Sequence, residues 1–214
     1  MSRHIWSPAE ISDASGPGSN VRNYLEQRDV RRCLSVAALE RPIESAGDVG
    51  CGYGRLTMVL AEFASSVVGF EREPGLVDIA RSLLPTVRFA QVASLARLPE
   101  PSASFDFVMS FTVVQHMRDS EAQAVLAEIK RLARGRYALL VEETDPDFQD
   151  GDPKTDAEGV TTGRAVETYR TWMDPFDLVL QFPRQIEPGY VRHNVGSYML
   201  FRDTATAGDS RLGT

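Results

Sequence analysis

Residues 48–54 read Asp-Val-Gly-Cys-Gly-Tyr-Gly, so three glycines alternate with other residues between a short apolar segment and a helical one. Glycine lets the backbone adopt a positive φ, and it lets a ligand approach more closely than a Cβ would allow. The helix that follows points its free N–H groups at whatever sits in the turn. The stretch therefore predicts a strand, a tight turn that holds a ligand, and a helix.

A second signal lies about 20 residues further along, where an apolar run ends on the carboxylate of Glu71. An acidic residue at this distance from a glycine-rich turn is placed to accept hydrogen bonds from ribose hydroxyls. Together, the turn and the acid predict a ligand that contains a nucleoside.

The composition restricts the possible partners. The chain has 214 residues, of which 43% are hydrophobic and 25% charged, which is ordinary for one α/β domain. We expect one domain over residues 1–203 and a flexible tail over 204–214. A net charge of −7 argues against nucleic acid, which needs a basic face, and favours small-molecule partners. The oligomeric state is not predicted.

Two cysteines, Cys33 and Cys51, cannot form a disulfide framework or a four-ligand metal site, so we expect reduced thiols and no metal. No segment has the pattern of a signal peptide, and none approaches the roughly 20 apolar residues of a membrane span. The sequence therefore predicts a soluble, cytoplasmic protein that does not bind membranes.

Strand-like and helix-like segments alternate, which is the pattern of a parallel sheet covered by helices. Helices are expected over residues 21–39, 55–64, 74–84, 119–134 and 164–173, the fourth of them capped by Asp119 or Ser120. Strands are expected up to residue 49 and over 66–71, 87–92, 105–110, 137–141, 178–182 and 195–202. The predicted fold is α/β: a doubly wound, mostly parallel seven-stranded sheet with an antiparallel C-terminal edge strand and an N-terminal leading helix.

Glycine turns with a downstream acid serve two cofactor classes, dinucleotides and S-adenosylmethionine. A dinucleotide turn has its third glycine where Arg55 stands, whereas this chain has its third glycine at Gly54. Asp48, at the end of the first strand, offers a carboxylate that suits an ammonium group and would repel a phosphate. The spacing and the charge both favour the sulfonium cofactor.

With these residues in register, the chain resembles the class I S-adenosylmethionine-dependent methyltransferases, in particular small-molecule enzymes related to those of quinone biosynthesis. The resemblance extends from residue 48 to 141 and includes Leu98-Pro99, Ser104-Phe105-Asp106 and residues 111–117. It implies a single Rossmann-like methyltransferase domain. The cofactor-binding residues that it implies are Asp48, Gly50, Cys51, Gly52, Tyr53, Gly54, Glu71, Ser94, Leu95, Ser110 and Phe111. Ser94 stands where many relatives have an aspartate that reaches the adenine amino group, and a serine oxygen can also accept that hydrogen bond.

Methyl transfer from a sulfonium needs a general base only when the acceptor must lose a proton. His116 is the first candidate for that base, and Glu143 is the second. His116 could instead cap or pack beneath the next helix, and Glu143 could simply begin a solvated loop. Neither residue belongs to a diagnostic motif.

The identity of the methyl acceptor is the main open question. Residues 111–114 read Phe-Thr-Val-Val, in place of the Asn/Asp-Pro-Pro-aromatic motif that similar enzymes use on nucleobase or glutamine amides. An O, N or C atom of a small molecule is the expected acceptor. The leading helix and the polar loop 142–163 are expected to close over the site. Two alternatives stay open: a nicotinamide-dependent oxidoreductase, and a noncatalytic protein that binds S-adenosylmethionine.

Overall fold

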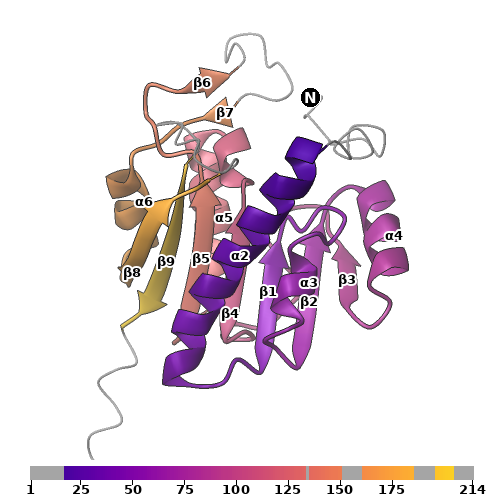
Figure 1. Cartoon of the computed structure of the whole chain (residues 1–214). Helices are drawn as coiled ribbons and strands as arrows, with labels where there is room; N and C mark the ends of the chain where they lie inside the picture. Colours follow the sequence, from indigo (N-terminus) through magenta and orange to yellow (C-terminus); the bar gives the residue numbers. More distant parts are fainter. Residues whose placement is uncertain (1–16, 134, 151–160, 186–195, 205–214) are drawn as a thin grey trace, which may run out of the picture.

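The computed structural model describes residues 17–133, 135–150, 161–185 and 196–204. In these ranges a seven-stranded sheet has the order β3-β2-β1-β4-β5-β9-β8 (Figure 1). Its strands are β1 (Ser45–Val49), β2 (Ser66–Glu71), β3 (Arg88–Gln91), β4 (Phe107–Phe111), β5 (Tyr137–Glu142), β8 (Phe176–Pro183) and β9 (Ser197–Asp203). The order confirms the predicted doubly wound α/β fold, because the first strand, β1, lies inside the sheet and later strands are added on both sides of it.

Strands β1 to β5 pair in parallel, and β9 pairs antiparallel with both β5 and β8. The predicted antiparallel pair therefore completes one side of the sheet, with β9 one position in from the edge and β8 outermost. In the central strands nearly every side chain is buried, as expected for strands covered on both faces.

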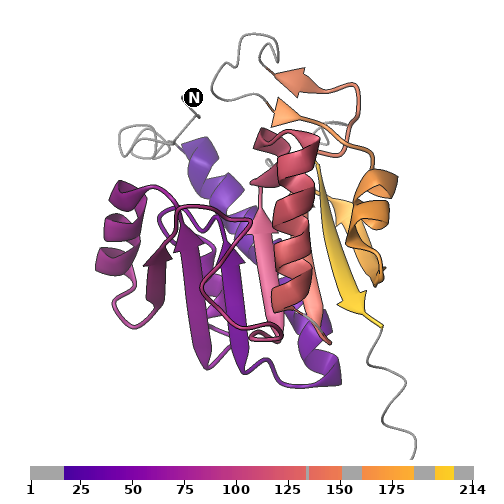
Figure 2. The ribbon, with the colours of Figure 1, turned by 180° about the vertical axis from the view of Figure 1, so that it is seen from behind.

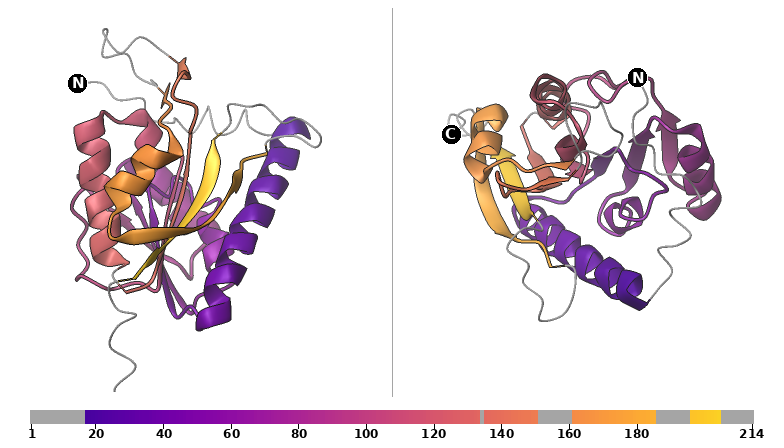
Figure 3. Two further views of the ribbon diagram at one scale, coloured as in Figure 1. Left: turned by 90° about the vertical axis from the view of Figure 1, so that its left-hand side faces the viewer. Right: turned by 90° about the horizontal axis from the view of Figure 1, so that it is seen from above.

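Helices cover both faces of the sheet. Figure 3 shows α2 (Pro17–Glu40) on one face and α5 (Asp119–Leu132) on the other. The short α3 (Thr57–Leu60) lies on the α2 face, whereas Figure 2 shows α5 on the opposite face with α6 (Val166–Met173) beside it. Two separate hydrophobic clusters, one on each face, fill the space between helices and sheet. Helix α4 (Pro74–Leu83) packs near β3.

Some predicted boundaries are wrong. The helix expected over residues 55–64 is α-helical only at Thr57–Leu60, because the chain after it forms tight turns with bonds such as Phe63 N–H to the Leu60 carbonyl (3.0 Å). Helix α5 begins at Asp119 without a side-chain cap, so neither Asp119 nor Ser120 has the predicted capping role. Helix α2 begins earlier than expected, at Pro17, a residue that suits a first helical turn.

The polar segment after β5 contains a two-stranded sheet, β6 (Gln149–Asp150) with β7 (Thr161–Thr162), above the carboxyl ends of the parallel strands in Figure 1. The two ends of this segment are linked by a hydrogen bond from the Gly163 N–H to the Phe148 carbonyl, at 2.9 Å. Residues 151–160 of the expected lid and residues 205–214 of the expected tail lie outside the described residues. Among the described helices, none is both long and apolar enough to cross a bilayer.

Candidate functional site

The glycine turn joins β1 to α3 at the carboxyl edge of the sheet. Gly50, Gly52 and Gly54 all adopt positive φ, at 77°, 56° and 85°. The N–H groups of Gly50 and Cys51 both donate to the Phe70 carbonyl on the neighbouring strand, at 2.8 and 3.1 Å. The left-handed backbone explains why glycine stands at each of the three positions.

The three glycines differ in what surrounds them. A Cβ on Gly50 would lie 2.6 Å from Val113, and one on Gly54 would lie 3.2 Å from Leu84 and Phe89. A Cβ on Gly52 would meet no heavy atom of the described residues within 4 Å. Gly50 and Gly54 are thus required by protein packing, whereas Gly52 borders open space into which a ligand could fit.

Glu71, at the end of β2, is bonded to this turn. Its Oε2 accepts from the Gly52 N–H at 3.0 Å, and its Oε1 accepts from the N–H groups of Arg72 (2.6 Å) and Glu73 (3.0 Å). A carboxylate has about four lone-pair sites, so Oε2 retains capacity for another donor. The predicted ribose acid and the predicted glycine turn are therefore brought together, with the carboxylate already oriented.

Asp48 lies beneath the turn instead of on its surface. It is 2% exposed, and its Oδ2 accepts a hydrogen bond from the Thr57 hydroxyl at 2.6 Å. Burial raises the pKa of its carboxyl to about 7, and the nearby Glu71 adds to the increase. The visible role of Asp48 is to link β1 to α3.

The other two residues of the turn differ in burial. The Cys51 thiol packs in a small cluster with Val77, Ala80 and Phe89, and burial raises its pKa. Cys51 can therefore offer a ligand its backbone only. Tyr53 is half-buried in the turn itself.

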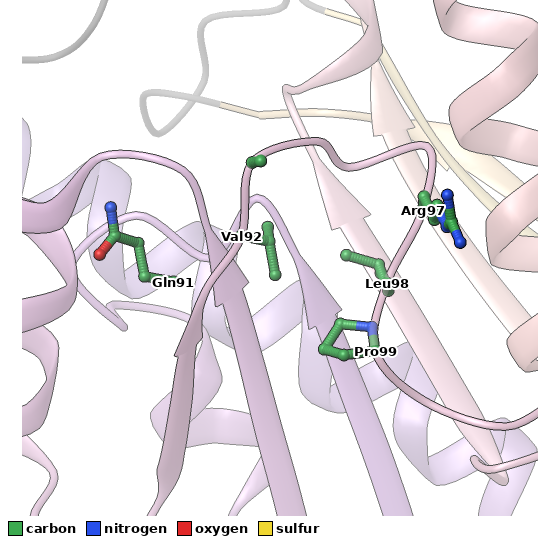
Figure 4. A pocket seen from close by; sticks show the side chains of 6 residues that line it. Gln91, Val92, Arg97, Leu98 and Pro99 are labelled. Carbon is green, nitrogen blue, oxygen red and sulfur yellow. The ribbon is translucent and has the colours of Figure 1, made fainter.

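The loop after β3 carries the residues predicted to flank adenine. Ser94 is exposed and its Oγ accepts from the Ala96 N–H at 3.2 Å, whereas the Leu95 side chain is buried. A pocket of about 430 Å³ lies against the same loop, lined by Gln91, Val92, Ala93, Arg97, Leu98 and Pro99 (Figure 4). Its lining residues precede and follow Ser94 and Leu95 in the chain.

The end of β4 combines an aromatic ring with two guanidinium groups. The Phe111 ring has Arg55 at 5.6 Å and Arg184 at 5.1 Å from its centroid. Both arginines also pair with the buried carboxylate of Glu26 on α2, at 2.6 Å for Arg55 and 2.5 Å for Arg184. Ser110 is fully buried, and its hydroxyl lies 3.5 Å from Glu142.

The backbone directly after Phe111 is strained. Thr112 adopts a φ of 53°, which is rare for a β-branched residue, and its N–H donates to the Val141 carbonyl at 2.7 Å. Such strain is often found at functional sites. It redirects the chain into η2 (Val114–His116).

The two candidate bases lie on either side of Gln115. His116 is exposed at the end of η2, with Nδ1 3.3 Å from the Thr161 hydroxyl of β7. Glu143 is 5% exposed, and its Oε1 accepts from the N–H groups of Thr144 and Asp145. Burial raises the pKa of Glu143, although the hydrogen bonds from the backbone N–H groups of Asp145 and Thr144 oppose the increase.

Glu142 has a clear structural role that the sequence did not indicate. It is fully buried, and its carboxylate accepts from the backbone N–H groups of Val113, Val114 and Gln115 at 3.2, 3.2 and 3.0 Å. Burial raises its pKa to about 7 although these hydrogen bonds lower it. Glu142 therefore fixes the turn that carries His116.

The residues that build this site are similar to those of a known protein family. Residues 47–135, which include the glycine turn, Glu71 and β4, match the family described as a methyltransferase domain. Over these residues the chain is similar to a methyltransferase domain. The match confirms the predicted family, and the part of the chain matched is the part that builds the carboxyl edge of the sheet.

Relatives of the methyltransferase domain include a probable S-adenosylmethionine-dependent methyltransferase of Mycobacterium tuberculosis, 33% identical over 145 residues that cover 63% of this chain and 49% of that protein. A magnesium-protoporphyrin O-methyltransferase of Rhodobacter capsulatus is 29% identical over 138 residues, which cover 62% of each chain. The chain spans about half the length of the first of these relatives.

The fold of the methyltransferase domain is also that of the N-methyltransferase NodS from Bradyrhizobium japonicum, whose structure contains S-adenosylhomocysteine. The two chains superpose with a TM-score of 0.65 at 15% identity, over 92% of this chain and 93% of NodS. This likeness confirms the predicted class I fold.

Proposed function

We propose that this protein binds S-adenosylmethionine at the glycine turn and transfers its methyl group to a small molecule. The observation that carries the proposal is the open space beside Gly52, bordered by the oriented carboxylate of Glu71. That carboxylate suits ribose hydroxyls, because a charged acceptor makes stronger hydrogen bonds than a neutral one. The family match over residues 47–135 supports the same cofactor.

The methionine portion of the cofactor would lie toward β1 and β4. Arg55, the more exposed of the two arginines that border Phe111, suits its carboxylate, and the ring itself suits the sulfonium. Asp48 is buried beneath the turn, so its interaction with the ammonium group would act through space and not by direct contact. Ser94 and Leu95 are the proposed adenine neighbours, through a hydroxyl and a backbone N–H.

Transfer from a sulfonium is an in-line displacement with a good leaving group, so alignment of the reacting atoms supplies much of the rate enhancement, on the order of 7 to 11 kcal/mol for well-oriented groups. For acceptors that must lose a proton, His116 and Glu143 are the proposed bases. We place the protein in the cytoplasm, and its acceptor is an O, N or C atom of a small molecule. The magnesium-protoporphyrin O-methyltransferase and NodS are named for O- and N-transfer.

Isothermal titration with S-adenosylmethionine, S-adenosylhomocysteine and NADH tests the cofactor assignment. We expect binding of the first two and none of NADH. Glu71→Gln should weaken S-adenosylhomocysteine binding about tenfold or more, since it replaces charged hydrogen-bond acceptors with a neutral amide. Glu44→Gln, at the exposed amino end of β1, removes the same charge and should leave affinity unchanged. Folded protein that binds NADH, or that binds neither sulfur compound, would refute the proposal.

A further inference from the structure

Gln115 links the two candidate bases through its side-chain amide. Its Oε1 accepts from the Glu143 backbone N–H at 2.8 Å, and its Nε2 lies 3.3 Å from Nε2 of His116. The residue is 8% exposed, so the amide is held largely inside the protein. Its contacts therefore bear directly on the state of the His116 ring.

The Glu143 contact fixes which end of the amide faces the histidine. A backbone N–H can only donate, so the amide atom opposite Glu143 N must be oxygen, and the amide nitrogen must face His116. That nitrogen can only donate, so His116 Nε2 must accept. A neutral ring then carries its proton on Nδ1, where the Thr161 hydroxyl at 3.3 Å can accept it.

The backbone that presents this amide is fixed on both sides. Glu142 accepts from the N–H of Gln115, and the guanidinium of Arg164 donates to the carbonyls of Val114 (3.1 Å) and Met117. Arg164 is itself 6% exposed and bonded to Asp119 at 2.9 Å. The amide is therefore held in place by charged groups on β5 and on the segment that leads into α6.

We propose that Gln115 is a positioning residue that holds His116 as the Nδ1–H tautomer. The His116 proton then lies on Nδ1, beside the Thr161 hydroxyl, and the basic lone pair on Nε2 is occupied by the Gln115 amide. The consequence for the reaction rests on the proposed function. His116 can remove a proton from the methyl acceptor only after the ring leaves Gln115.

Long-range ¹H–¹⁵N correlation spectra of the full-length, ¹⁵N-labelled protein test the tautomer at a pH where the ring is neutral. The chain has 3 histidines, and His116→Gln identifies the His116 signals by their loss. We expect the His116 Nδ1 shift in the protonated range and the Nε2 shift in the unprotonated range. A neutral ring protonated at Nε2 would overturn the proposal. The spectra need no methyl donor, so a failure of the tautomer assignment and a failure to bind S-adenosylhomocysteine are separate results.

Gln115→Glu keeps the shape of the side chain but gives it an acceptor at both ends. The carboxylate can still accept from Glu143 N–H, and its second oxygen should draw the His116 proton to Nε2. Gln123→Glu adds the same charge on the exposed face of α5 and should leave the tautomer unchanged. An Nδ1–H ring in folded Gln115→Glu would contradict the proposal. If this variant does not fold, the tautomer of His116 measured in the wild-type protein is sufficient to support or overturn the proposal.

Discussion

Gly52 combines a positive φ with a position beside the space proposed for the cofactor. Gly52→Ala should reduce S-adenosylhomocysteine affinity strongly, because its Cβ would project into the space proposed for the cofactor. The free energy of unfolding should fall by only about 1 to 2 kcal/mol, the cost of a left-handed alanine. Calorimetry and urea unfolding measure the two effects.

The control for this variant is Gly135→Ala, because Gly135 also has a positive φ (86°) and lies at the start of β5, at the opposite edge of the sheet. It should reduce stability while S-adenosylhomocysteine affinity stays unchanged. Equal loss of affinity in both variants would mean that backbone strain, and not ligand contact, explains the Gly52 effect.

Residues differ in how far the sequence could predict them. The glycines were predictable because a positive φ is a local requirement that glycine meets. Glu71 was predictable as the ribose acid because it follows the glycine turn by about 20 residues. The positions of Gln115 and Glu142 were not predictable, since their partners lie 27 to 29 residues away and meet only after β4 and β5 pair. The inward direction of the Cys51 thiol depends on packing in the same way.

At the scale of elements, η2 depends on a buried carboxylate with a raised pKa. Glu142 binds a proton more tightly in the folded protein (pKa about 7) than in the unfolded chain, whose reference value is 4.5. Its contribution to stability is therefore fully present below pH 4.5 and is lost as the pH rises through 7. Glu142→Gln removes this titration.

Urea unfolding of the wild type and of Glu142→Gln between pH 8 and pH 5 measures that contribution. The wild type should gain stability relative to the variant as the pH falls, with a slope of at most about 1.4 kcal/mol per pH unit. Asp48 titrates in both proteins and cancels in the comparison. Parallel pH profiles would show that Glu142 does not have the raised pKa.

A buried ion cluster connects α2, the glycine turn and β8. Burial would raise the pKa of Glu26, but Arg184, Arg55 and Arg22 together lower it to about 2. Glu26→Gln leaves these guanidinium groups without their shared carboxylate, so unfolding at pH 7 should require about 3 to 5 kcal/mol less. The difference in unfolding free energy should shrink as the pH falls from 4.5 toward 2. The ionised Glu26 carboxylate stabilises the folded protein, and protonation removes that contribution.

The control for Glu26 is Glu62→Gln, which breaks an exposed pair with Arg31 at 2.6 Å. An exposed ion pair contributes less than about 1 kcal/mol, so this variant should unfold nearly as the wild type does. Similar stability losses in the two variants would contradict the special role of the Glu26 cluster.

Among elements, the best predicted were two of the parallel strands. Strands β2 and β5 appear at nearly the expected residues, because strands buried on both faces form continuous apolar runs. Helix α3 was overestimated, since its apolar spacing extends through turns that only the packed structure distinguishes from helix. The short β6 and β7 carry no apolar pattern and could not be located from the sequence.

At the scale of the whole molecule, the topology places the proposed site. Ligands of open α/β sheets bind at the carboxyl ends of the strands, where the strand order reverses. Here β1 lies between β2 and β4 (Figure 1). The glycine turn follows β1, and Glu71 and Phe111 are the last residues of β2 and β4, so all three lie at this edge. The protein is acidic overall, with a net charge of −7, yet it places Arg55 and Arg184 at this edge.

A crystal structure of the protein with S-adenosylhomocysteine tests directly whether the cofactor binds between the glycine turn and Glu71. We predict that the ribose hydroxyls donate to the Glu71 carboxylate, that the ligand passes within contact distance of Gly52, and that its methionine portion lies beside Phe111. A ligand bound elsewhere, with Glu71 making no contact to it, would contradict the proposed cofactor site.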